Sequence, residues 1–144
     1  MKNILIIEDN ADNIIVYKLL LKEYNLYIYN ELNKAVDFIR MSDEINNIHL
    51  AILDINMGTG LKISGFNIFY YIYKKCPSIP IVICTAYSSE EKVQKYANLI
   101  NAEIVEKPIN SDFQKIINNI LDRKLKLYVD EFEQLFREFI TGIE

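Results

Sequence analysis

Short apolar runs alternate along the chain with stretches that carry helical spacing. Each run is four or five residues long and is bounded by polar or turn-forming residues, as is typical of strands buried on both faces of a sheet. The predicted strands are residues 3–7, 26–29, 49–53, 81–84 and 103–106. The predicted helices are residues 14–22, 33–41, 65–75, 88–99 and from residue 111 onwards. Five strand–helix units predict an α/β fold, a doubly wound parallel sheet with helices on both faces.

Local signals indicate where three of these helices begin or end. Pro77 cannot continue a helix, so the third predicted helix should end before it. Ser88 with Glu91, and Ser111 with Gln114, have the spacing of a capping box. We therefore expect Ser88 and Ser111 to cap the fourth and fifth helices.

The last part of the chain carries a longer apolar pattern. Apolar residues recur there at alternating spacings of four and three, at Leu121, Leu125, Tyr128, Phe132, Leu135 and Phe139. This predicts an amphipathic helical extension over residues 124–144, attached to a domain formed by residues 1–123. Its apolar side could fold back on the domain or pair with a second copy in a homodimer. Nothing follows Glu144 to form an output domain, so we expect a stand-alone domain.

Composition narrows the class of protein. With 144 residues, 51% of them apolar, the chain is long enough for one well-buried core. A net charge of −4 without a cluster of Lys and Arg argues against direct binding of nucleic acid. No apolar run approaches the roughly 20 residues that span a bilayer, and the N-terminus lacks the features of a signal peptide. Cys76 and Cys84 are too few for a disulfide framework. We expect a cytoplasmic protein with free thiols that does not enter a membrane.

Polar residues of matched chemistry follow the predicted strands. Because parallel strands point the same way, their carboxyl ends meet at one edge of the sheet, where such sheets bind ligands. The residues at these ends are Glu8 with Asp9, Asp54, Thr85 and Lys107. The fold should therefore bring three carboxylates, a hydroxyl and an ammonium group together.

This set of groups suits phosphoryl transfer. Three carboxylates in one place repel one another unless a cation neutralises them, and Mg²⁺ binds few protein carboxylates while accepting waters and phosphate oxygens. A carboxylate can attack phosphorus to form an acyl phosphate. A hydroxyl can donate to a phosphoryl oxygen, and an ammonium group neutralises its charge. The residue types favour phosphoryl transfer to Asp54, assisted by Thr85 and Lys107.

Within residues 1–123 the chain carries four motifs in this order: Ile6-Ile7-Glu8-Asp9-Asn10, Leu53-Asp54-Ile55-Asn56-Met57, Thr85-Ala86 and Lys107-Pro108. Together they closely resemble the motifs of response regulator receiver domains of two-component signalling. The resemblance implies a flavodoxin-like, CheY-like sheet with strand order 2-1-3-4-5. It also implies that Mg²⁺ is held by Glu8, Asp9, Asp54 and the backbone carbonyl of Asn56.

The resemblance further implies that Asp54 takes its phosphoryl group from a sensor histidine kinase or a histidine phosphotransfer protein. Thr85 and Lys107 would contact that group. Such a domain is a signalling switch and not an enzyme, and its phosphorylation changes how it binds a downstream protein. His49 is the only His and begins a predicted strand, without the surroundings of a phosphodonor. We therefore expect an outside donor.

The sequence departs from the family pattern in three places. Glu8 stands where Asp is commoner, and the loop at residues 58–64 is longer than usual. Ile104 stands three residues before Lys107, where the family often carries Tyr or Phe. Tyr87 could occupy that surface instead and shield the phosphoryl group.

Other interpretations are compatible with the same residues. A receiver-like interaction module with little or no phosphorylation would fit the changed loop and Ile104. A Mg²⁺-dependent phosphatase would need an acid two residues after its Asp nucleophile, and here that residue is Asn56. Structural roles are also available, because Glu8 and Asp9 could cap the first helix and Lys107 could be a solvated side chain.

Overall fold

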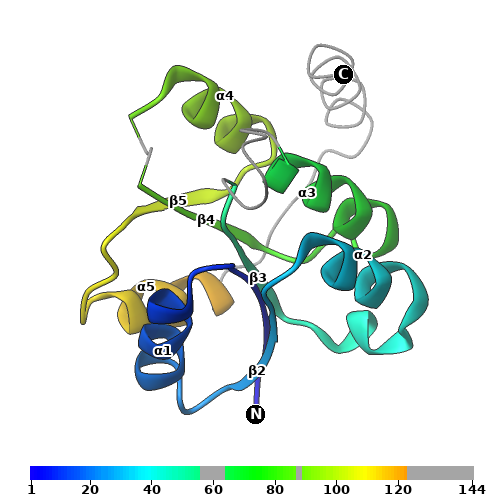
Figure 1. Ribbon diagram of the computed structural model, residues 1–144, viewed down its shortest axis with the longest axis horizontal. Coiled ribbons are helices and arrows are strands. Elements are labelled where there is room, and N and C mark those ends of the chain that lie inside the picture. Colours follow the sequence, from blue (N-terminus) through cyan, green and yellow to red (C-terminus); the bar gives the residue numbers. More distant parts are fainter. Residues whose placement is uncertain (56–63, 87–88, 123–144) are drawn as a thin grey trace.

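The computed structural model of the chain describes residues 1–55, 64–86 and 89–122 (Figure 1). Its strands are β1 Asn3–Ile7, β2 Asn25–Tyr29, β3 Leu50–Leu53, β4 Ile81–Thr85 and β5 Glu103–Glu106. Its helices are α1 Ala11–Leu20, α2 Leu32–Met41, the short 3₁₀ helix η1 Asp43–Asn47, α3 Ser64–Lys75, α4 Glu91–Leu99 and α5 Phe113–Leu121.

The strands form one parallel sheet. Their order is β2-β1-β3-β4-β5, which confirms the predicted fold class and strand order. The register pairs Ile7 with Leu53 and Thr85 with Glu106, so neighbouring strands end almost level. The carboxyl ends therefore form one edge, where Glu8 follows β1 beside Asp54 after β3, and β4 extends to Thr85 next to them.

Helices cover both faces of the sheet (Figure 1). On one face α1 and α5 pack together, and the rings of Tyr17 and Phe113 join them with centroids 5.7 Å apart. On the other face α2, α3 and α4 pack on residues such as Leu5 and Ile7. Successive residues of each central strand are buried on alternate faces, which explains why the strands are apolar throughout.

Helix α1 begins three residues earlier than the pattern predicted. Asn10 is its N-cap, and the Asn10 side chain accepts a hydrogen bond of 3.1 Å from the backbone N–H of Asn13. This satisfies one of the amide groups that the first turn leaves open. The cap places the helix immediately after Glu8 and Asp9.

The two predicted capping boxes are wrong. Helix α4 has Glu90 as its N-cap and α5 has Asp112, and neither side chain makes a capping hydrogen bond. Before α5, the side chain of Asn110 accepts from the backbone N–H of Asp112 at 2.9 Å. In this Asx turn the backbone N–H of Asp112 is already bonded to the Asn110 side chain. The helix therefore starts at Phe113, and Ser111 lies outside it.

Several predictions fall outside the described residues. These are the loop at residues 58–64 apart from its last residue, the positions Asn56 and Tyr87, and the helical extension at residues 124–144 with its boundary at residue 123. They stay predictions. Of the helices that are described, none is both long and apolar enough to cross a bilayer.

Candidate functional site

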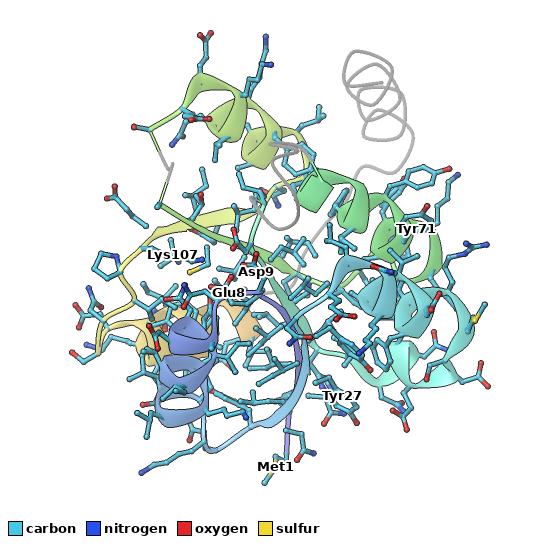
Figure 2. All side chains as sticks on the ribbon, viewed as in Figure 1. Met1, Glu8, Asp9, Tyr27, Tyr71 and Lys107 are labelled. Carbon is cyan, nitrogen blue, oxygen red and sulfur yellow. The ribbon has the colours of Figure 1, made fainter. Side chains whose placement is uncertain are left out.

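The carboxyl edge of the sheet gathers the residues predicted from the strand ends. Backbone hydrogen bonds continue the sheet one residue beyond the strands, from Asp54 N–H to the Ile7 carbonyl at 3.0 Å and from Lys107 N–H to the Thr85 carbonyl at 2.9 Å. Figure 2 shows the side chains of Glu8, Asp9 and Lys107 close together at this edge. The sheet itself thus positions the cluster.

Three carboxylates lie within reach of a single ion. Glu8, Asp9 and Asp54 each offer an oxygen atom, and these atoms all lie within 4.8 Å of one another. Asp9 is exposed, whereas Glu8 is 1% and Asp54 7% exposed. Two of the carboxylates are therefore buried and one faces solvent at the mouth of the cluster.

Lys107 is part of the same cluster and not a solvated side chain. Its ammonium nitrogen Nζ lies 2.6 Å from Glu8 Oε1 and 3.2 Å from Asp54 Oδ2. Both contacts are charge-assisted hydrogen bonds that Lys107 donates. One ammonium group thus bridges two buried acids.

The cluster carries more negative charge than Lys107 neutralises. Burial, with the neighbouring Asp54, raises the pKa of Glu8 to about 7 although Lys107 lowers it. Burial would lower the pKa of Lys107, but its hydrogen bond to Glu8 and the charge of Asp54 raise it. Glu8 Oε2 is also buried without a hydrogen-bond partner among the described residues. A buried anionic oxygen of this kind needs a cation or a proton.

The residues present fit a small, hard dication. Carboxylate oxygens are the ligands that Mg²⁺ prefers, and a site with an exposed side leaves room for its waters. A dication would also provide a partner for Glu8 Oε2. Asn56, the fourth predicted ligand, lies outside the described residues.

The structural alternatives fit less well. Asn10 caps α1, so Glu8 and Asp9 are not its N-cap. Thr85 is 1% exposed as the last residue of β4 and does not belong to an open turn. Within the described part of the chain, the buried polar and charged residues are Glu8, Asp54 and Thr85, and all three were predicted as site residues.

The sequence did not indicate that Lys107 would hold both Glu8 and Asp54. Its contact with Glu8 joins residues 99 positions apart and depends on the direction of a long, flexible side chain. Ile104 is half-buried and packs on the core beneath α2, α3 and α4. Whether Tyr87 takes over the role of an aromatic switch stays a prediction.

The raised pKa of Glu8 predicts a pH-dependent stability in Mg²⁺-free buffer. The folded pKa is about 7 against 4.5 for the ordinary group, so the associated stability is complete below pH 4.5 and is lost as the pH rises through 7. The loss amounts to about 3 kcal/mol at most. Urea unfolding in EDTA should show that the free energy of unfolding falls from pH 5 to pH 8 in the wild type, and that this fall is absent in Glu8→Gln. If the free energy of unfolding changed with pH in the same way in both proteins, the raised pKa of Glu8 would be contradicted.

The family model of the response regulator receiver domain matches residues 4–134. A search of curated proteins found no match.

Solved structures of receiver domains share the fold. A CheY-like receiver domain protein from Methanospirillum hungatei is 21% identical, with a TM-score of 0.71 over 93% of this chain and 98% of that chain. The non-phosphorylated HemR receiver domain from Leptospira biflexa is 20% identical, with a TM-score of 0.72 over 89% of this chain and 100% of that chain. A two-component response regulator from Clostridium difficile is 24% identical, with a TM-score of 0.70 over 85% and 98%.

The family match spans most of the chain, and the strand order and the acidic edge agree with it. The chain therefore belongs to the response regulator receiver domains.

Proposed function

We propose that Asp54 accepts a phosphoryl group in a Mg²⁺-dependent reaction and that this changes how the domain binds other proteins. The observation that carries the proposal is the placement of the Asp54 carboxylate, 3.2 Å from the Lys107 ammonium and within reach of an ion shared with Glu8 and Asp9. A carboxylate that can act as a nucleophile, acids that can hold a cation and a fixed positive charge therefore lie together, which supports the proposal.

The chemistry follows from these groups. Glu8, Asp9 and Asp54 would hold Mg²⁺, with the carbonyl of Asn56 as predicted, and the ion would supply positive charge to the phosphoryl oxygens. An oxygen of the Asp54 carboxylate attacks phosphorus, and the new O–P bond forms as the bond to the donor breaks. A phosphohistidine donor leaves as imidazole after taking a proton from solvent, and acetyl phosphate leaves as acetate.

Lys107 and Thr85 act on the transferred group. In the structure Lys107 is bound to Glu8 and Asp54, and we infer that one of these bonds is exchanged for a phosphoryl oxygen. The Thr85 hydroxyl, at the end of β4, donates to another. These new contacts shift the conformational equilibrium of β4, β5 and the helices that follow them.

The donor is proposed to be another protein, a sensor histidine kinase or a histidine phosphotransfer protein. His49 is exposed, and its Nδ1 accepts a hydrogen bond of 3.0 Å from the backbone N–H of Asn3. It precedes β3, whereas Asp54 follows that strand, so the strand of four residues, about 13 Å long, separates them. His49 cannot pass a phosphoryl group to Asp54 of its own chain.

The proposed protein is a signalling switch and not a turnover enzyme. Asn56 stands where a phosphatase of this chemistry needs a general acid. The net charge of −4, without a cluster of Lys and Arg, supports a protein target in place of nucleic acid. Cys76 and Cys84 are free thiols, which supports a reducing, cytoplasmic location.

The test is phosphorylation by radiolabelled acetyl phosphate. With Mg²⁺ the chain should take up one phosphoryl group per molecule, and EDTA should prevent this. The linkage should be labile to hydroxylamine, as an acyl phosphate is, and should map to Asp54. Beryllofluoride with Mg²⁺ should give a saturable change in the protein's spectrum. No labelling and no response to beryllofluoride would instead favour an interaction module that does not use phosphate.

A further inference from the structure

One surface outside the candidate site combines cations with aromatic and apolar side chains. It lies where the C-terminal part of α3 meets the C-terminal end of α2, and Figure 2 labels Tyr71 on α3 at this place. We call it the α2–α3 face, and its members are Arg40, Met41, Tyr70, Tyr71, Lys74 and Lys75.

Local contacts hold the cations of this face beside the rings. The Arg40 guanidinium lies 5.9 Å from the ring centroid of Tyr71, and the Lys74 ammonium 5.6 Å from that of Tyr70. Lys75 donates a hydrogen bond of 2.7 Å to the Arg40 carbonyl near the end of α2. The ring attracts the cation and holds it in place on this face.

The α2–α3 face has the composition of an interface. Met41 is 78% and Tyr70 37% exposed. Arg40 and Lys75 form no ion pair with a carboxylate anywhere in residues 1–55, 64–86 and 89–122. Aromatic residues, Met and Arg are the types that interfaces enrich. The matching occupant is a segment that carries both acidic and apolar side chains.

The chain contains such a segment. Residues 130–144 hold five acidic residues and one Arg, so this segment has a net charge of −4, the same as the net charge of the whole chain. They also contribute Phe132, Leu135 and Phe139 to the apolar pattern of the C-terminal region, and Glu131 and Glu138 each precede an aromatic position of that pattern.

We propose that residues 130–144 dock on the α2–α3 face of their own chain, with acidic side chains on its cations and aromatic side chains on its exposed apolar groups. Each helix runs antiparallel to the strands, so α2, α3 and α5 all end at the amino edge of the sheet. Crossing from one helix layer to the other takes about 20 Å, at roughly 10 Å for each packed layer. Residues 123–129 span about 10 Å as a helix but up to about 25 Å when extended. The proposal therefore makes these residues an extended linker and keeps the helix of the C-terminal extension within residues 130–144.

Docking within one chain is favoured over docking between chains. A segment tethered by a short linker has an effective concentration in the millimolar range. Micromolar protein does not compete with that unless the contact between two copies is much larger. This inference does not depend on phosphorylation of Asp54.

Hydrogen exchange on the full-length chain tests the inference. Backbone amides of residues 130–140 should be protected in the wild type. Protection should fall about three- to tenfold in the double variant Arg40→Glu, Lys74→Glu, and also at high salt. Lys18→Glu with Lys22→Glu is the matched control, because these exposed cations lie at the α1 side of the sheet, and it should leave protection unchanged. Circular dichroism should show that each variant is folded.

A charge swap and the oligomeric state complete the test. Adding Glu131→Lys and Glu138→Lys to the Arg40→Glu, Lys74→Glu variant should restore most of the protection, whereas the two tail changes alone should reduce it. Light scattering should give the mass of one chain throughout. Equal exchange in the wild type and the Arg40→Glu, Lys74→Glu variant would overturn the proposal, and so would loss in the α1 control. Protection that appears only with a dimer mass and rises with concentration would make a second copy the occupant and also overturn it.

Discussion

Asp54→Asn is expected to abolish phosphorylation by acetyl phosphate while the chain stays folded. An amide oxygen is a far weaker nucleophile than a carboxylate, and Asn also removes one ligand from the proposed Mg²⁺ site. The labelling rate should fall at least about a thousandfold, to background. The melting temperature in EDTA should not fall, because Asn removes charge that now repels Glu8.

Asp37→Asn is the control for this change. Asp37 is an exposed acid on α2, away from the carboxyl edge of the sheet, and its variant should be labelled like the wild type. Full labelling of the Asp54→Asn variant at another residue would show that the acidic edge is not the acceptor site. Loss of the folded state in this variant would make Asp54 a structural residue.

The fold was predictable because the sheet has a simple pattern. Strands buried on both faces read as short apolar runs, and helices between them need one apolar side, so strand and helix alternate visibly along the sequence. The ends of β1 and β5 agree with the prediction. The 3₁₀ helix η1 was missed, because five residues are too few to show a period.

Helix starts were less predictable than strands. Around α5, Asn110, Ser111 and Asp112 are all residues that can cap a helix. The side chain of Asn110 forms the turn and the helix begins after Asp112, a choice that depends on small differences in local geometry. Sequence spacing alone does not separate such neighbours.

The candidate site was predictable where the backbone determines it. Parallel strands bring their carboxyl ends together whatever the side chains do, so Glu8, Asp54 and Thr85 had to be neighbours once the sheet was assigned. The position of the Lys107 ammonium is different, since four rotatable bonds decide which acid it meets. Its bridge between Glu8 and Asp54 therefore emerges only from the structure.

This bridge leads to the second large effect, expected for Lys107→Met. Met keeps much of the length and apolar volume of the side chain but leaves Glu8 and Asp54 without their cation. Removing one partner of a buried charge cluster is costly, and after allowing for the partial exposure of Lys107 we expect a loss of about 2–3 kcal/mol at pH 8 without Mg²⁺. The loss should shrink toward pH 6, because Glu8 then takes up a proton and carries no charge.

Metal binding and phosphorylation should respond to Lys107→Met in opposite directions. Mg²⁺ should bind several-fold more tightly, since an internal cation no longer competes for the same carboxylates. Phosphorylation by acetyl phosphate should slow about a hundredfold or more, since a fixed positive charge on the transferred group is gone. Titration with Mg²⁺ and the labelling rate measure the two effects separately, with Lys115→Met as the control on the exposed side of α5. A purely structural Lys107 would weaken both, so tighter Mg²⁺ binding combined with slower labelling distinguishes a group that acts on the phosphoryl oxygens.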